Sequence, residues 1–175
     1  MRKLIALAAL IGVAAPGFSQ DVTLQNKPLD IKATILKHFK TSQDFTVKVA
    51  AAMPDADYGF KLTVPQMSFG GQMVHLAQGF DYFLSPIYGE TAKPPKPASA
   101  TKADVMAFVK ESFDRASERI GPLTSEQLEK IYKTDEGSQS GLDLLLGMLD
   151  HTTHHRASAE MYLRAKGVTP PAYRF

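Results

Sequence analysis

Apolar residues recur every three or four positions in four long segments of the chain, which is the period of an amphipathic helix. These segments span residues 28–53, 68–88, 101–120 and 140–166. In the first segment, for example, Leu29, Ala33 and Leu36 fall on roughly one helical face. The pattern therefore predicts four main helices.

Residues that start and stop helices agree with these boundaries. Three positions have the sequence of an N-terminal cap or capping box: Ser68, Thr101 with Asp104, and Ser140 with Asp143. Three others are typical stop signals: Pro54, Gly121 and Gly167. Pro28 suits the first position of the first helix. Thr41–Asp44 is a further capping-box match, at which a helix could kink or restart, but one helix is expected over residues 28–53.

The segments between the helices predict loops and one short helix. Residues 55–67 are expected to form a loop, and the proline-rich residues 91–99 a stiff surface connection. Residues 124–132 are expected to form a short helix, followed by a polar loop at 134–140. No segment alternates apolar and polar residues over a useful length, so no strand is expected. The predicted fold is all-α: an antiparallel four-helix bundle with a short extra helix before the last long helix.

The first 19 residues have the features of a secretory signal peptide. Two basic residues precede an apolar run at 4–15, and the small residues Gly17 and Ser19 suit a signal peptidase. The run is shorter than the roughly 20 residues that span a membrane. An uncleaved amphipathic helix fits poorly, because the run is apolar on every face. We therefore expect cleavage after Ser19, a periplasmic or secreted protein without a stable membrane anchor, and one domain spanning residues 20–175.

The amino-acid composition limits which binding and catalytic functions the domain could have. The 175-residue chain has 20 basic and 18 acidic residues, and removing Arg2 and Lys3 with the leader leaves 18 of each. A neutral domain of this kind is not expected to bind nucleic acid. The chain has no Cys, which excludes disulfides, Cys-ligated zinc, iron–sulfur clusters and a cysteine nucleophile. Metal or acid–base chemistry therefore falls to Asp, Glu and the five His residues.

Three of the His residues lie close together in the last predicted helix. His151 and His155 are four residues apart, so both side chains project from one face and could hold one divalent ion. His154 lies about 100° away from His155 and could pair with His151 instead. The apolar stripe through Leu144 and Met148 favours His151 and His155 as the inward pair. Such spacing alone, however, is more often a coincidence at a solvated or core-edge position.

His75 strengthens the metal interpretation from a second helix. It shares a face of that helix with Leu76, where an unpaired buried His would be costly. A facing helix would make His75 the third ligand and leave open positions for water and substrate. His38 lies beside Lys37 and Lys40 and is expected on the surface.

Six segments spread over nearly the whole mature chain carry a family resemblance. They are Ala50–Pro54, Tyr58–Phe60, Ser68–Gly70, Val74–Ala77, Leu149–His155 and Met161–Pro171. Together they resemble the DinB/YfiT-like superfamily of metal-binding four-helix bundles. Such families place one ligand on the second helix and two, four residues apart, on the last. The resemblance therefore implies that His75, His151 and His155 bind a divalent ion such as Zn, Ni or Mn.

One departure from the family pattern follows the last ligand. Many relatives continue with Arg-Gly-Gln, whereas this chain has Arg156-Ala157-Ser158. Groups behind the ligands orient them and tune the metal. The departure leaves the three His residues in place but removes a Gln that could support them.

The resemblance implies several chemistries for such a site. Relatives include thiol S-transferases, thiol-dependent isomerases and uncharacterised hydrolases. Export argues against cytosolic thiols as cosubstrates, so a hydrolase-like enzyme acting on an unidentified small molecule ranks above a thiol S-transferase. The alternative is a non-catalytic metal-binding or stress-related bundle. Asp150 and His154 are the candidate acid or base near the site, and the resemblance also implies a homodimer.

Missing motifs disfavour other metal sites. The sequence contains no Glu-x-x-His pair of the kind that ferritin-like di-iron proteins use. It also lacks the His-Glu-x-x-His motif of zinc proteases. A non-covalent haem held by Met and His agrees less well with clustered His residues than a three-His metal site does.

Overall fold

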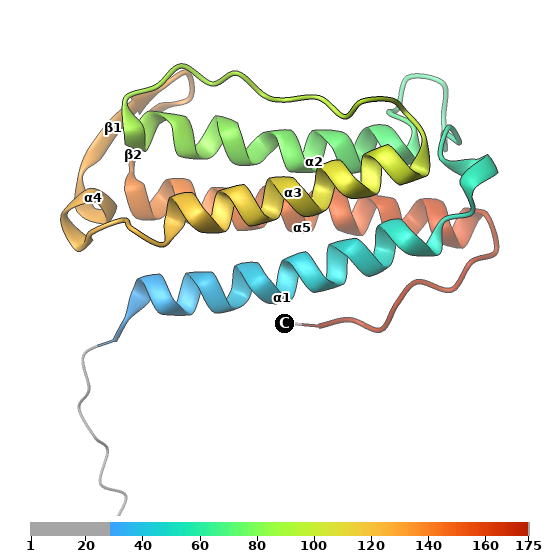
Figure 1. Ribbon diagram of the computed structural model, residues 1–175, viewed down its shortest axis with the longest axis horizontal. Helices are drawn as coiled ribbons and strands as arrows, with labels where there is room; N and C mark the ends of the chain where they lie inside the picture. Colours follow the sequence, from blue (N-terminus) through green and yellow to red (C-terminus); the bar gives the residue numbers. More distant parts are fainter. Residues whose placement is uncertain (1–28, 175) are drawn as a thin grey trace, which may run out of the picture.

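Four long helices lie side by side in the computed structural model, which describes residues 29–174 (Figure 1). They are α1 (Ile31–Ala52), α2 (Phe69–Leu84), α3 (Lys102–Ile120) and α5 (Gly141–Ala165). The predicted four-helix bundle is therefore confirmed. The expected signal peptide, its cleavage after Ser19 and the expected helix start at Pro28 lie outside the described residues.

The helices do not follow one another around the bundle in sequence order. Both α1 and α2 pack against α3 and α5, so the consecutive helices α1 and α2 are diagonal partners. Figure 1 shows α1 and α5 running in one direction and α2 and α3 in the other. The expected antiparallel arrangement therefore holds for the pairs α2–α5 and α1–α3, whereas α2 and α3 run parallel. Residues 89–101 connect them by returning along the length of the bundle (Figure 1).

Side-chain caps begin the helices where the sequence indicates. Three residues accept a hydrogen bond from the backbone N–H three positions on: Ser68, Thr101 and Ser140. Ser140 and Asp143 form the full capping box, whereas the N–H of Thr101 bonds Ser99 rather than Asp104. The first helix has Asp30 as its cap and runs without a break through residues 41–44.

Short 3-10 helices extend two of the connections. One, η1 (Asp55–Asp57), lies in the expected loop between α1 and α2. The other, η2 (Ser85–Tyr88), continues directly from α2, so the two elements together cover the predicted helix at 68–88. Gly89 follows with a φ of 68°, a left-handed conformation that glycine adopts without strain.

The segment before α5 differs from the prediction. The short helix α4 (Ser125–Glu129) ends before the expected residue 132, and strands β1 (Ile131–Thr134) and β2 (Gly137–Ser140) form an antiparallel hairpin. The predictions of a polar loop and of no strand are therefore wrong here. Only Tyr132 of these strands is buried, so no alternation of apolar and polar residues marks them. Gly137 allows the turn through its φ of 115°.

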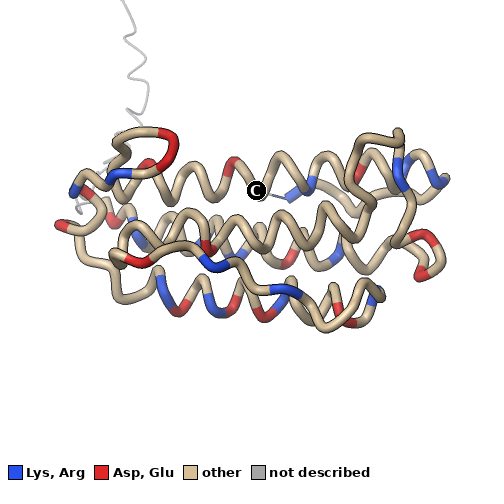
Figure 2. Tube along the Cα trace, turned by 90° about the horizontal axis from the view of Figure 1, so that it is seen from above, with Lys and Arg blue, Asp and Glu red and all other residues tan. Residues whose placement is uncertain are grey.

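Aromatic rings fill the middle of the bundle. Phe39 of α1, Phe80 of α2 and Phe113 of α3 lie with their ring centroids 4.6–5.2 Å apart. Charged residues of both signs are spread along the tube in Figure 2. In the part of the chain that the structure describes, no helix is both long enough and apolar enough to cross a membrane.

Candidate metal centre

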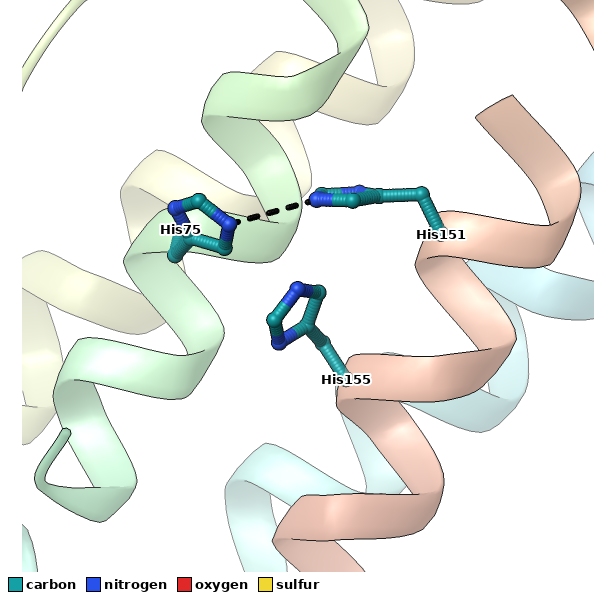
Figure 3. A group of neighbouring side chains, drawn as sticks. All are labelled: His75, His151 and His155. Carbon is teal, nitrogen blue, oxygen red and sulfur yellow. Dashed lines mark hydrogen bonds between the residues drawn. The ribbon is translucent and has the colours of Figure 1, made fainter. Parts of the chain in front are cut away.

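Three His side chains from two helices point toward one another where α2 packs against α5 (Figure 3). His75 comes from α2, and His151 and His155 come from α5; one nitrogen of each lies within 4.8 Å of the others. The Nε2 atoms of His75 and His151 are 3.3 Å apart. The structure thus brings together the three residues that the sequence and the family resemblance indicate.

The remaining His residues lie outside this cluster. His155 is only 8% exposed and His151 is half-buried, which agrees with the apolar stripe on α5. His154 is exposed, although its ring centroid is 4.9 Å from that of His155. Asp150 is exposed as well, and His38 lies on the surface as expected. Neither His154 nor Asp150 belongs to the group that could hold a metal ion.

Two glycines allow the helices to approach each other at the site. A Cβ atom on Gly79 would overlap Cε1 of His151, so the His151 ring occupies the space that a side chain on α2 would need. A Cβ atom on Gly147 would lie 3.0 Å from Cε1 of Phe83. The His151 ring of α5 therefore packs against Gly79 of α2, and the Phe83 ring of α2 packs against Gly147 of α5. The rings of Phe83 and His151 are in turn 5.8 Å apart.

Gln72 holds the ring of His155. Its Oε1 atom lies 2.7 Å from Nδ1 of His155, and Gln72 is itself buried. Because an amide oxygen only accepts, Nδ1 carries the proton and Nε2 keeps a free lone pair. That tautomer is the one in which a metal ligand binds through Nε2. Gln72 thus supports the ring of His155 from α2.

Burial keeps the two α5 histidines neutral. Desolvation, followed by the nearby His75 and His154, lowers the pKa of His151 to about 4. Desolvation likewise lowers the pKa of His155 to about 4, with smaller effects from His151, His75 and His154. Neutral imidazole is the form that binds metal ions. Nδ1 of His151 is buried without a hydrogen-bond partner among the described residues, whereas Nε2 of the same ring lies at hydrogen-bond distance, 3.3 Å, from Nε2 of His75.

Arg156 faces away from the cluster toward α1. It is only 5% exposed, and its Nη1 atom donates to Ser42 Oγ at 2.7 Å. Its guanidinium carbon lies 4.7 Å from the centre of the Phe45 ring. Burial lowers the pKa of Arg156, while Glu160 and Tyr173 act in the opposite direction. The residue after the last candidate ligand therefore anchors α5 to α1.

Sequence reasoning missed three residues of the site: Gln72, Gly79 and Phe83. All three lie on α2 at positions three before, four after and eight after His75. Residues at these spacings share one helical face. Their spacing from His75 therefore indicates in the sequence that all three lie near the site.

The family comparison agrees with this architecture. A model of the DinB family matches residues 23–175. A DinB-like protein from Bacillus cereus ATCC 10987 superposes with a TM-score of 0.71 at 16% identity, covering 81% of this chain and 97% of that one. A DinB-like protein from Bacillus subtilis gives a TM-score of 0.66 at 21% identity, covering 80% and 96%. At these identities the likeness establishes the fold.

A third structure carries a functional description of its own. YfiT from Bacillus subtilis is described as a probable metal-dependent hydrolase with an unusual four-helix bundle topology. It gives a TM-score of 0.60 at 17% identity, covering 78% of this chain and 87% of that one. A search of curated proteins found no match.

Gly79→Ala should move the His151 ring out of its position between the helices. Because the new Cβ would overlap this ring, His151 must turn toward solvent, and its pKa should rise from about 4 toward 6.5. NMR titration of the imidazole protons in metal-free protein measures this change. Gly59→Ala is the control, since a Cβ there meets no atom within 4 Å and the residue lies outside α2 and α5, so the His151 pKa should stay near its original value. An unchanged pKa in Gly79→Ala would show that the glycine does not position the ring.

Metal-free protein should lose stability as the pH falls from 6.5 to about 4. The pKa of His151 and of His155 is about 4 in the fold against 6.5 for an unperturbed His, so the unfolded chain binds more protons in this window. Stability is therefore present above pH 6.5 and is lost as the pH falls. Thermal denaturation with a chelator present should show a flatter profile for His151→Leu, whereas His38→Leu should follow the original protein. Parallel pH profiles of stability for the original protein, His151→Leu and His38→Leu would show that His151 does not cause the loss of stability at low pH.

Proposed function

The chain belongs to the DinB family, and we propose that it binds one divalent metal ion through His75, His151 and His155 and uses it in a hydrolase-like reaction. The observation that carries the proposal is the convergence of three imidazoles from two helices at the α2–α5 contact. The description of YfiT as a probable metal-dependent hydrolase supports the choice of reaction.

The spacing of one pair of nitrogens, those of His75 and His151, fits a metal ion. Two ligands that bind a tetrahedral zinc ion at about 2.0–2.1 Å are themselves about 3.3–3.4 Å apart. The Nε2 atoms of His75 and His151 are 3.3 Å apart. Imidazole ligands suit Zn and Ni as well as other first-row ions, so the donor set supports a divalent ion without selecting one.

The ligand count supports a reactive rather than a closed site. Within residues 29–174 no fourth His, Cys, Asp or Glu joins the three-His group. Catalytic metal sites of this type use three protein ligands and keep a further position open. When bound, the ion would supply Lewis acidity toward an oxygen atom at that position.

The chain's own residues prepare the site for this role. Gln72 fixes the His155 tautomer, and Gly79 lets the His151 ring approach α2. Burial keeps the pKa of His151 and His155 low, so neither must lose a proton at neutral pH before it binds. Preformed geometry of this kind lowers the cost of binding.

Metal analysis tests the ligand assignment. Purified protein should contain about one divalent ion per chain, and His151→Ala should lose most of it, because two imidazoles remain. Inductively coupled plasma mass spectrometry gives the content, with His38→Ala as a control that should retain the ion. Gln72→Leu should bind about 10–100-fold more weakly through loss of ligand support. Equal metal content in the original protein and His151→Ala would refute the assignment.

The same proteins test the reaction. Hydrolysis of p-nitrophenyl esters should disappear on chelation, return when metal is restored, and be absent from His151→Ala. Full metal content without hydrolysis of esters or amides would instead support a non-catalytic metal-binding bundle. This outcome would leave the ligand assignment intact.

We further propose that the protein is exported, on the basis of the basic start, the apolar run and the small residues before Gln20. When residues 1–175 are expressed in a Gram-negative bacterium, the periplasmic protein should begin at Gln20 on N-terminal sequencing. Leu10→Arg should retain the chain in the cytoplasm by interrupting the apolar run. A periplasmic chain beginning at Met1 would contradict cleavage, and a cytoplasmic original protein would contradict export.

A further inference from the structure

A groove of about 590 Å³ lies between α2 and the 89–101 connection, and His75 forms part of its wall. The groove is bounded by the first half of α2, by the loop before it and by the second half of the 89–101 connection. Its other lining residues include Tyr58, Met67, Val74, Gln78, Lys96 and Ala100. A volume of this size is typical of sites for small molecules.

The connection that covers the groove is held to α2 at two points. The backbone N–H of Lys93 donates to Asp81 Oδ2 at 2.6 Å, and Gln78 Nε2 donates to the carbonyl of Pro95 at 2.9 Å. Prolines around these anchors limit the backbone conformations of the segment. The groove is therefore largely formed before any ligand enters.

The lining combines apolar surface with one positive charge. Lys96 is the only Lys, Arg, Asp or Glu among the described residues that line the groove. None of the described residues forms a salt bridge with it. Met67 and Val74 contribute apolar surface, and the loop beside them exposes Val64 by 89%. A single cation beside apolar surface complements a monoanion with an apolar body.

We propose that this groove binds the substrate or product of the candidate metal centre, and that this molecule is a small carboxylate with an apolar body. The inference rests on the proposed function, because His75 belongs both to the groove and to the proposed ligand set. Lys96 attracts the carboxylate, and Met67 and Val74 contact the apolar body.

Binding of octanoate, measured by isothermal titration calorimetry on the metal-free full-length domain, tests the groove. Ala100→Phe should weaken binding at least about tenfold, because the ring fills the groove and clashes with the ligand. Lys96→Gln should weaken it about two- to fivefold, as expected for an exposed ion pair. The neutral analogue octanamide should bind more weakly than octanoate by a similar factor.

Matched variants on the same connection separate these effects from changes in folding. Ala98→Phe and Lys93→Gln alter residues that do not line the groove, and both should bind octanoate like the original protein. Thermal denaturation checks that Ala100→Phe remains folded. Undetectable octanoate binding, or equal binding by Ala100→Phe and Ala98→Phe, would overturn the proposal.

A paramagnetic ion separates this proposal from the metal assignment. In protein loaded with Mn²⁺, the NMR signals of bound octanoate should broaden strongly, and the Ala100→Phe variant should abolish the broadening while retaining Mn²⁺. Octanoate binding by protein that takes up none of Mn²⁺, Ni²⁺ and Zn²⁺ would contradict the metal centre and leave the groove as a carboxylate site. Mn²⁺ uptake with bound octanoate that does not broaden would overturn the link between groove and metal.

Discussion

The candidate site depends on the close contact between α2 and α5. Gly79 on α2 makes room for His151, and Gly147 on α5 makes room for Phe83. On each helix the glycine and the ring are four residues apart, so the two contacts lie one helical turn from each other. Together they fix both the separation of the helices and their register. A shift of α5 by one residue would carry His151 away from Gly79 and from His75. The site is therefore a property of the helix pair rather than of the His-rich sequence alone.

The chemistry proposed for the site follows from a described ligand group made only of imidazoles. Three neutral imidazoles would leave a bound divalent ion with its full double positive charge, and such an ion would act as a Lewis acid. No carboxylate belongs to the described three-His group, so nothing within it stabilises a protonated imidazole. Burial accordingly lowers the pKa of His151 and His155 to about 4. Because His151 and His155 stay neutral, each keeps a nitrogen lone pair with which it could bind a metal ion.

Features that depend on residues close together in the sequence could be predicted, whereas features that depend on contacts between distant segments could not. The caps at Ser68 and Ser140 act within one turn, so the starts of α2 and α5 could be predicted from local sequence. The polar hairpin at 131–140 has little apolar pattern and depends on pairing between its strands, so it was not predicted. The direction of α3 depends on a long connection whose path no local rule determines. The convergence of His75, His151 and His155 could be predicted because their spacing resembles a family pattern, whereas Gly79 matters only once α5 lies against it.

Arg156 helps to orient α5 so that its His residues face α2. The helix packs against both α1 and α2, so its rotation about its own axis decides which residues face each of them. His155 faces α2, and the next residue, about 100° further around the helix, bonds Ser42 and packs on Phe45 of α1. Gln72 on one side and Ser42 on the other thus fix the rotation of α5 at adjacent residues. A buried guanidinium is costly to leave unpaired, so any rotation that frees Arg156 from Ser42 is disfavoured. The arrangement makes the α1 contact as necessary to the site as the α2 contact, although no atom of α1 belongs to the three-His group.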